Sequence, residues 1–336
     1  VDPFGKNLNG WMWYAEDIKV KTIADFAKTK NKKTASVYWP VTAGADIDFN
    51  IPQYWRGKNI EDEKILKLLS TKGLYEEISQ RTKIIVSEIT TDAEKVRAGI
   101  YIWKNKKPDV LFIYTTDLDT AHHAYGIYSE KAKEKLIAID SLVKELMEET
   151  QIYEKKNIGF IVVSDHGFKE IRSMCYPNSE LKQRGLFLPE KESWRAYFKT
   201  LGGFSVLLEN DSQNFSLSKK DLSNLKESIE SKCKDTTFLF EGKNFEKLKN
   251  KFHSKGKAFL YSTKETGFGE KSDEPVSKHL DKSFANHGFL PIDPSMKTIL
   301  VSYPKKDGTK LKSIKDVFKL SCAWLQIDCT KGEKKN

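Results

Sequence analysis

Apolar runs of strand length alternate with stretches of helical periodicity along most of this chain of 336 residues. The strongest strand signals are residues 34–39, 110–114 and 158–163, which are short, largely apolar runs. The clearest helix is residues 129–150, where apolar side chains gather on one face. This alternation is typical of an α/β fold with a central, mostly parallel sheet flanked by helices.

Weaker patterns predict the remaining elements. Helices are expected at residues 18–29, 60–69, 92–103, 218–231 and 314–325. Strands are expected at residues 204–208 and 296–303, the last of them in the core, and a strand–helix–strand set at residues 237–262. Loops are expected at the polar residues 114–126 and 164–167 and at the Gly- and charge-rich residues 263–281.

The domain organisation follows from the absence of repeats and of a long linker. We therefore expect one large domain over residues 1–336, incomplete at its N-terminal end for reasons given below. Pro177, Gly185 and Pro189 interrupt the pattern after the third strong strand. Residues 175–282 are predicted to form an inserted, cap-like subdomain.

Composition supports a globular protein, with 39% hydrophobic and 12% aromatic residues. No apolar run approaches the roughly 20 residues that a membrane-spanning helix needs. The net charge of +10 comes mainly from scattered lysines. It favours small anionic substrates, but zinc-finger and helix-turn-helix patterns are lacking, so we expect no specific nucleic-acid binding. The sequence does not indicate an oligomeric state.

Four cysteines, at positions 175, 233, 322 and 329, have neither zinc-ribbon nor Cys-x-x-Cys spacing. These cysteines can form one or two disulfides if the protein is exported. Cys322 stands in an apolar, helix-like stretch and is expected to be buried.

Potential metal ligands gather just after two of the strong strands and again before the late strand. Asp and His residues stand in residues 117–123 and 165–166, and His287 stands alone. These segments hold four of the six histidines in the chain. Carboxylates and imidazoles together suit zinc and other divalent ions, and open α/β sheets bind ligands beyond the carboxyl ends of their strands. The alternative for each segment is that its Asp and His residues are ordinary turn residues.

The spacing of these residues resembles that of the type I phosphodiesterase/nucleotide pyrophosphatase family, within the alkaline phosphatase superfamily. The family places a His four positions after an Asp and a Gly three further on, as at Asp119, His123 and Gly126. Its strand followed by Ser-Asp-His-Gly is matched at residues 164–167, and its late His-Gly at residues 287–288. The likeness includes a Trp-Pro segment at residues 39–42 and implies an alkaline-phosphatase-like fold.

The resemblance implies two divalent metal ions, with Zn²⁺ as the expected metal. Asp119, His123 and His287 would hold one ion, and Asp165 with His166 would help to hold the second. Asp117 and His122 do not match the positions of the family motif and are left out of the ligand set.

Relatives supply one further Asp ligand and a Thr or Ser nucleophile from an N-terminal segment. Residues 1–3 resemble the stretch that follows this nucleophile. We therefore expect the nucleophile upstream of residue 1 and no catalytic hydroxyl within the chain.

The implied activity is hydrolysis of phosphodiester or nucleotide pyrophosphate bonds in a small phosphate-ester or nucleotide substrate. The alternatives within the same superfamily are a phosphomonoesterase, a phosphonate hydrolase and a phosphomutase, which would use the same metal ligands. Two alternatives belong to a different class of function. One is a non-catalytic metal- or phosphate-binding fragment, and the other is an α/β domain whose Asp and His residues are structural. Relatives are mostly exported, which implies a periplasmic or secreted protein, although residues 1–5 carry no export signal.

Overall fold

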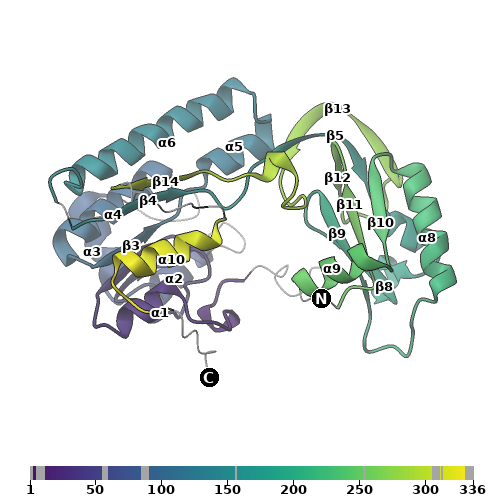
Figure 1. The fold of residues 1–336 in the computed structure, drawn as a ribbon, viewed down its shortest axis with the longest axis horizontal. Helices are drawn as coiled ribbons and strands as arrows, with labels where there is room; N and C mark the ends of the chain where they lie inside the picture. Colours follow the sequence, from purple (N-terminus) through teal and green to yellow (C-terminus); the bar gives the residue numbers. More distant parts are fainter. Residues whose placement is uncertain are drawn as a thin grey trace. The chain divides into compact units, whose positions relative to one another are not determined.

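A computed structural model describes residues 3–4, 12–54, 60–84, 91–155, 157–252, 255–304, 311 and 313–329 (Figure 1). The chain divides into two compact units, named here for their main sheets. The parallel-sheet unit comprises Leu8–Asp119, Lys133–Val163 and Ile299–Asn336. The antiparallel-sheet unit comprises Val1–Asn7, Thr120–Ala132 and Ser164–Thr298.

The parallel-sheet unit is built on short apolar strands. These are β1 (Thr34–Val37), β2 (Phe49–Ile51), β3 (Val110–Ile113), β4 (Phe160–Val163) and β14 (Leu300–Tyr303). β1 pairs in parallel with both β2 and β3, which gives the order β2-β1-β3. β14 pairs with β4 in the antiparallel sense. The parallel pairing of β1 with β3, which the helices between residues 60 and 106 separate along the chain, agrees with the predicted α/β class.

The parallel-sheet unit also contains helices. They are α1 (Ile23–Lys28), α2 (Ile60–Leu69), α3 (Leu74–Thr82), α4 (Asp92–Lys106) and α10 (Lys315–Trp324), with a 3₁₀ turn at Ala15–Asp17. α5 (Asp117–Tyr125) and α6 (Glu130–Glu149) have residues in both units. α4 contacts β1 and β3, α1 contacts β1, and α2 and α3 contact β2. Their apolar faces bury Val37, Ala98 and Ile102, which removes this core from water.

The antiparallel-sheet unit contains a larger number of strands. They are β5 (Lys169–Cys175), β6 (Phe187–Leu188), β7 (Ser193–Trp194), β8 (Ala196–Thr200), β9 (Phe204–Glu209), β10 (Thr236–Leu239), β11 (Ala258–Ser262), β12 (Thr266–Phe268) and β13 (Ser277–Asn286). Its helices are α7 (Pro177–Gln183), α8 (Lys219–Lys232) and α9 (Lys243–Phe252), with 3₁₀ turns at Pro189–Lys191 and Pro294–Met296.

The described strands of this second unit form three sheets, in the orders β10-β11-β9-β8, β12-β5-β13 and β6-β7. Phe198, Leu207 and Leu260 lie fully buried in its core. A disulfide joins Cys175 at the end of β5 to Cys233 directly after α8. The range 175–282 lies inside the main segment of this unit, and its status as an insertion stays a prediction.

The structure differs from the predicted pattern in three segments. Residues 114–126, expected to be a loop, contain α5. Residues 263–281 contain β12 and the first part of β13, which both pair with β5. β14 was expected in the core, but Val301 in it is 60% exposed. For β12 and β13 the deciding contact is the pairing with β5, a distant part of the chain, which local periodicity does not record.

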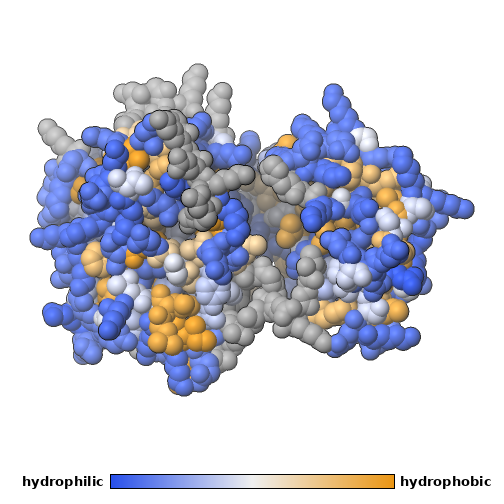
Figure 2. Space-filling view, turned by 90° about the horizontal axis from the view of Figure 1, so that it is seen from below, coloured by the Kyte–Doolittle hydropathy of each residue, from blue (hydrophilic) through white to orange (hydrophobic). Residues whose placement is uncertain are grey.

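Hydrophilic residues cover most of the face of each unit seen in Figure 2, with smaller hydrophobic patches among them. This surface agrees with the many lysines in the composition. Among the helices of the described ranges, none has the length and apolar character that crossing a membrane requires.

A buried carboxylate links α7 to α8. Glu180 accepts hydrogen bonds from Lys232 (2.6 Å), Ser228 (2.8 Å) and Arg184 (2.8 Å), and its side chain is only 4% exposed. Burial by itself raises the pKa of Glu180, but these hydrogen bonds outweigh it and hold the pKa below its usual value.

Glu180→Gln is therefore expected to lower the free energy of unfolding at pH 7 by roughly 1–3 kcal/mol, because charged hydrogen bonds are lost. A lowered folded-state pKa contributes stability above the unfolded pKa and loses it as the pH falls through the folded value. The difference between wild type and variant should consequently shrink in acid. Urea unfolding at pH 7 and at about pH 3 measures this, and a difference independent of pH would contradict it.

Candidate metal centre

Helix α5 carries two of the predicted ligands. Asp119 and His123 are four positions apart, so a helix places them on the same face, one turn from each other. A loop would impose no such relation. The helix is therefore the reason why the Asp-x-x-x-His spacing brings the two side chains to one face.

The pairing of β13 with β5 brings two further histidines together. In this antiparallel ladder Asn286 lies opposite Lys169, so His287 after the one strand comes beside the segment just before the other. His166 stands in that segment. The two imidazole rings are stacked, with their centroids 3.7 Å apart.

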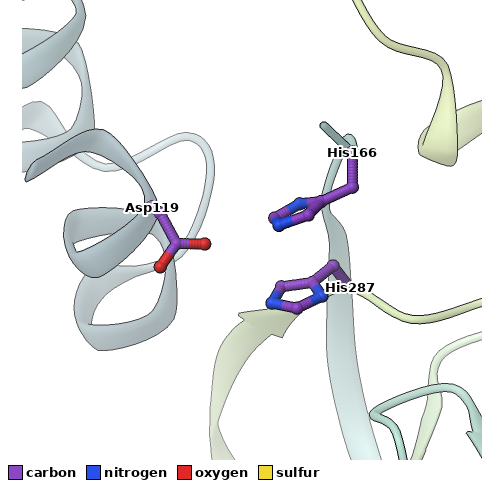
Figure 3. A group of neighbouring side chains, drawn as sticks. All are labelled: Asp119, His166 and His287. Atoms are coloured by element: carbon purple, nitrogen blue, oxygen red, sulfur yellow. The ribbon is translucent and has the colours of Figure 1, made fainter. Parts of the chain in front are cut away.

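Asp119, His166 and His287 converge on one point. Each offers one ligand atom, and these three atoms lie within 4.8 Å of one another. Figure 3 shows the Asp119 carboxylate directed from its helix toward the two imidazoles. Donors of this type and separation fit a divalent metal ion.

The other two predicted ligands lie beside this group without joining it. The His123 ring centroid is 5.1 Å from that of His287. The Asp165 side chain is 58% exposed, and its Oδ1 lies 3.6 Å from Nε2 of His166. Their assignment as ligands, and the division of all five residues between two ions, stay predictions.

Backbone carbonyls select one tautomer of two imidazoles. Nδ1 of His123 lies 3.1 Å from the carbonyl oxygen of Ala285, and Nδ1 of His166 lies 3.1 Å from that of Gly167. Because a carbonyl only accepts, each Nδ1 must donate, which leaves the lone pair of a neutral ring on Nε2. A ligand histidine in metal sites is commonly held in this way.

His287 is in the form that a metal requires. Burial lowers its pKa to about 4, and the neighbouring His166 and His123 disfavour its charged form further. It is therefore neutral at pH 7, and only the neutral imidazole coordinates a metal ion.

Phe168 is a site residue that the sequence analysis missed. Its ring makes edge contacts with His123, His166 and His287, at centroid distances of 5.0, 5.3 and 5.4 Å. It also contacts His122 at 4.7 Å, so this histidine packs near the group without being part of it. The available signal was its position directly after Ser-Asp-His-Gly, where an apolar side chain can support the ligands.

Gly288 allows the backbone of His287 to pass close to another segment. Its φ is +77°, and a Cβ there would lie 1.6 Å from the carbonyl oxygen of Leu201. The carbonyl of His287 in turn accepts a hydrogen bond from the backbone N–H of Gly203, at 3.2 Å. Only glycine fits this approach, which sets the direction of the His287 side chain.

Gly288→Ala is expected to destabilise the protein by more than the roughly 1–3 kcal/mol of a strained φ alone, because the methyl group also displaces backbone. Gly185→Ala is the matched control, since Gly185 has φ +67° and open space around its Cβ position. Chemical denaturation compares the two variants. Equal losses would contradict the role given to the contact with Leu201.

Comparison with known proteins bears on what this site does. Residues 2–263 match the sequence profile of the type I phosphodiesterase / nucleotide pyrophosphatase family. The chain belongs to this family. It is thereby a phosphodiesterase/pyrophosphatase-type hydrolase of the alkaline phosphatase superfamily. No curated protein matches it in sequence.

Solved structures resemble this phosphodiesterase-family chain in fold. Murine ectonucleotide pyrophosphatase/phosphodiesterase 5, in an inactive form in complex with AMP, is 14% identical, with a TM-score of 0.60 over 94% of this chain and 72% of its own. The human protein is 13% identical, with a TM-score of 0.59 over the same shares. At this identity the likeness concerns the fold, and it confirms the alkaline-phosphatase-like architecture.

Proposed function

We propose that the protein hydrolyses phosphodiester or nucleotide pyrophosphate bonds in small substrates with the help of two divalent metal ions, Zn²⁺ being the expected metal. The observation that carries this proposal is the convergence of Asp119, His166 and His287 in a chain of this family. The complex of the murine structure with AMP agrees with a nucleotide substrate for that relative.

The donor set fits one such ion. Asp119 would supply a charged oxygen, while His166 and His287 would supply imidazole nitrogens. When bound, divalent ions stabilise the negative charge that develops on phosphoryl oxygens and orient the reacting groups. The chain's part is to hold these donors on a helix and on two paired strands, which keeps them rigid.

We propose that Asp165, beside His166, and His123, beside His287, complete the ligand set of the two ions. The carboxylate of Asp165 is exposed enough to accept an ion without breaking a buried contact. The lone pair of His123 stands on the ring nitrogen that does not face Ala285. Either could share an ion with His166 or His287.

We further propose that the Thr or Ser nucleophile comes from a segment encoded ahead of residue 1. Two strands of the parallel-sheet unit support this. Among the described residues β3 pairs only with β1, and β4 pairs only with β14. All residues of β3 and β4 are only partly buried, although both strands are strongly apolar. An additional strand beside either one would cover these side chains and their unpaired backbone groups.

The four cysteines support a proposal about the cellular location. All four are paired, Cys175 with Cys233 and Cys322 with Cys329. Disulfides persist in oxidising compartments. We propose that the protein works in the periplasm or outside the cell.

The test compares two forms of the protein, the 336-residue chain and a form with any residues encoded ahead of Val1. Zinc content is measured for both, together with hydrolysis of bis(p-nitrophenyl) phosphate and p-nitrophenyl phosphate. We expect both forms to bind zinc and the longer form to hydrolyse the diester faster, with loss on chelation and recovery with Zn²⁺. Faster monoester hydrolysis would overturn the diesterase proposal, and zinc binding without turnover in either form would favour the non-catalytic alternative.

A further inference from the structure

An ion pair is buried at the start of α4, in the parallel-sheet unit. Asp92 is 2% exposed and Lys95 is 1% exposed, and Nζ of Lys95 lies 3.2 Å from Oδ1 of Asp92. Burying two charges is costly, and apolar residues of similar size often stabilise a protein as well or better. The pair therefore calls for an explanation other than stability, which its remaining contacts provide.

Asp92 binds the beginning of α5. Its carboxylate accepts hydrogen bonds from the backbone N–H of Thr116 at 2.9 Å and from that of Asp117, the first residue of the helix, at 2.8 Å. The first N–H groups of a helix have no acceptor within the helix, and a negative charge there also suits the helix dipole. Asp92 thus acts as an N-terminal cap supplied from 25 residues away. Asp119 lies two residues further along the capped turn.

Lys95 connects the same turn to the loop after β1. It donates to Oγ1 of Thr116 at 2.8 Å, and its Nζ lies 4.7 Å from the centroid of the Tyr38 ring. Tyr38 is 1% exposed, has φ +61° and directly precedes Trp39. The ammonium group therefore lies between the segments that follow β1 and β3. These two strands are parallel neighbours, so their carboxyl ends lie side by side.

We propose that Asp92 and Lys95 are positioning residues that fix the first turn of α5 and thereby the carboxylate of Asp119 for metal binding. This inference rests on the proposed metal-dependent function. Without the cap, the N–H groups of Thr116 and Asp117 lose their acceptor and the turn shifts or frays. A ligand displaced by about 1 Å no longer meets the geometry of a metal site.

The test uses Asp92→Asn, the double variant Asp92→Asn/Lys95→Met and the control Arg97→Met. Asparagine keeps the size of aspartate but has only one accepting oxygen for the two backbone N–H groups. The double variant also removes the buried positive charge of Lys95, which the single variant would leave uncompensated. Arg97 lies on the same helix in an exposed ion pair with Glu145, so its loss is expected to matter little.

Two quantities are measured for each variant: the Zn²⁺ dissociation constant, by competition with a chromogenic chelator, and the urea midpoint of the metal-free protein. We expect Asp92→Asn to weaken zinc binding by about 10–100-fold, as loss of an outer-shell partner typically does. In the double variant the urea midpoint should return most of the way to wild type while zinc binding stays weak. Arg97→Met should match wild type in both.

Recovery of both quantities in the double variant would reduce the pair to a structural role and overturn the inference. So would unchanged zinc binding in Asp92→Asn, provided that wild type binds zinc through Asp119. If wild type binds no zinc, or if Asp119→Asn binds zinc as tightly as wild type, the result contradicts the proposed metal-dependent function itself. The two failures are therefore distinguishable.

Discussion

Asp119→Asn is expected to weaken zinc binding by at least about 100-fold, beyond the 10–100-fold typical of a lost outer-shell partner. Asparagine has nearly the same size, so the helix should persist while the only carboxylate of the converging group loses its charge. The remaining donors, His166 and His287, are neutral rings, and two neutral ligands bind a divalent ion less tightly than a set with a carboxylate. The Zn²⁺ dissociation constant from chelator competition measures the effect.

Asp117→Asn is the matched control on the same helix. Asp117 lies two residues before Asp119, but its carboxylate pairs with Lys135 at 2.8 Å and lies outside the converging group. We expect its zinc affinity to stay within about threefold of wild type, because a partly exposed ion pair contributes little. Similar losses in both variants would mean that charge near the helix, and not ligation by Asp119, determines binding.

Joint replacement of Cys175 and Cys233 by alanine is expected to lower the free energy of unfolding by about 4 kcal/mol, on the chain-entropy account of disulfides. The bond closes a loop across 58 residues and joins β5 to the end of α8 within one core. Without it the unfolded chain gains the freedom that the loop had removed. Urea unfolding of the metal-free protein under oxidising conditions measures the loss.

The Cys322–Cys329 disulfide provides the comparison, because it spans only 7 residues. Its joint replacement by alanine is expected to cost about 2 kcal/mol, since a short loop restricts the unfolded chain less. A reducing agent breaks both disulfides, so it should bring wild type and the two variants to similar stability. Equal effects of the two replacements would contradict the dependence on loop length.

Much of the secondary structure was predictable because its signals are local. The range of α2 matches the prediction from residue 60 to residue 69, and α8 begins after Ser218, whose side chain caps it. The strand–helix–strand set of residues 237–262 corresponds to β10, α9 and β11. Cys322 is buried as expected, and the structure adds that it is disulfide-bonded. Periodicity and caps are properties of neighbouring residues, so a single sequence displays them.

The elements that carry the site were harder to predict. The nine residues of α5 show weak periodicity, and the helix begins where Asp92, from another element, accepts its first N–H groups. β13 has mostly exposed side chains, and its pairing with β5 defines it as a strand. Such contacts join residues far apart in sequence, which local patterns do not encode.

The sequence by itself determined the chemistry available to this protein: the α/β class, the family and the Asp and His residues in their order along the chain. Tertiary structure alone decided which of them meet. It brought the ligand atoms of Asp119, His166 and His287 within 4.8 Å of one another, and the β5–β13 ladder is what places the two imidazoles side by side. The physical reason is that motif spacing fixes residue types and local geometry, whereas the position of a ligand atom depends on strand register and helix capping across the fold.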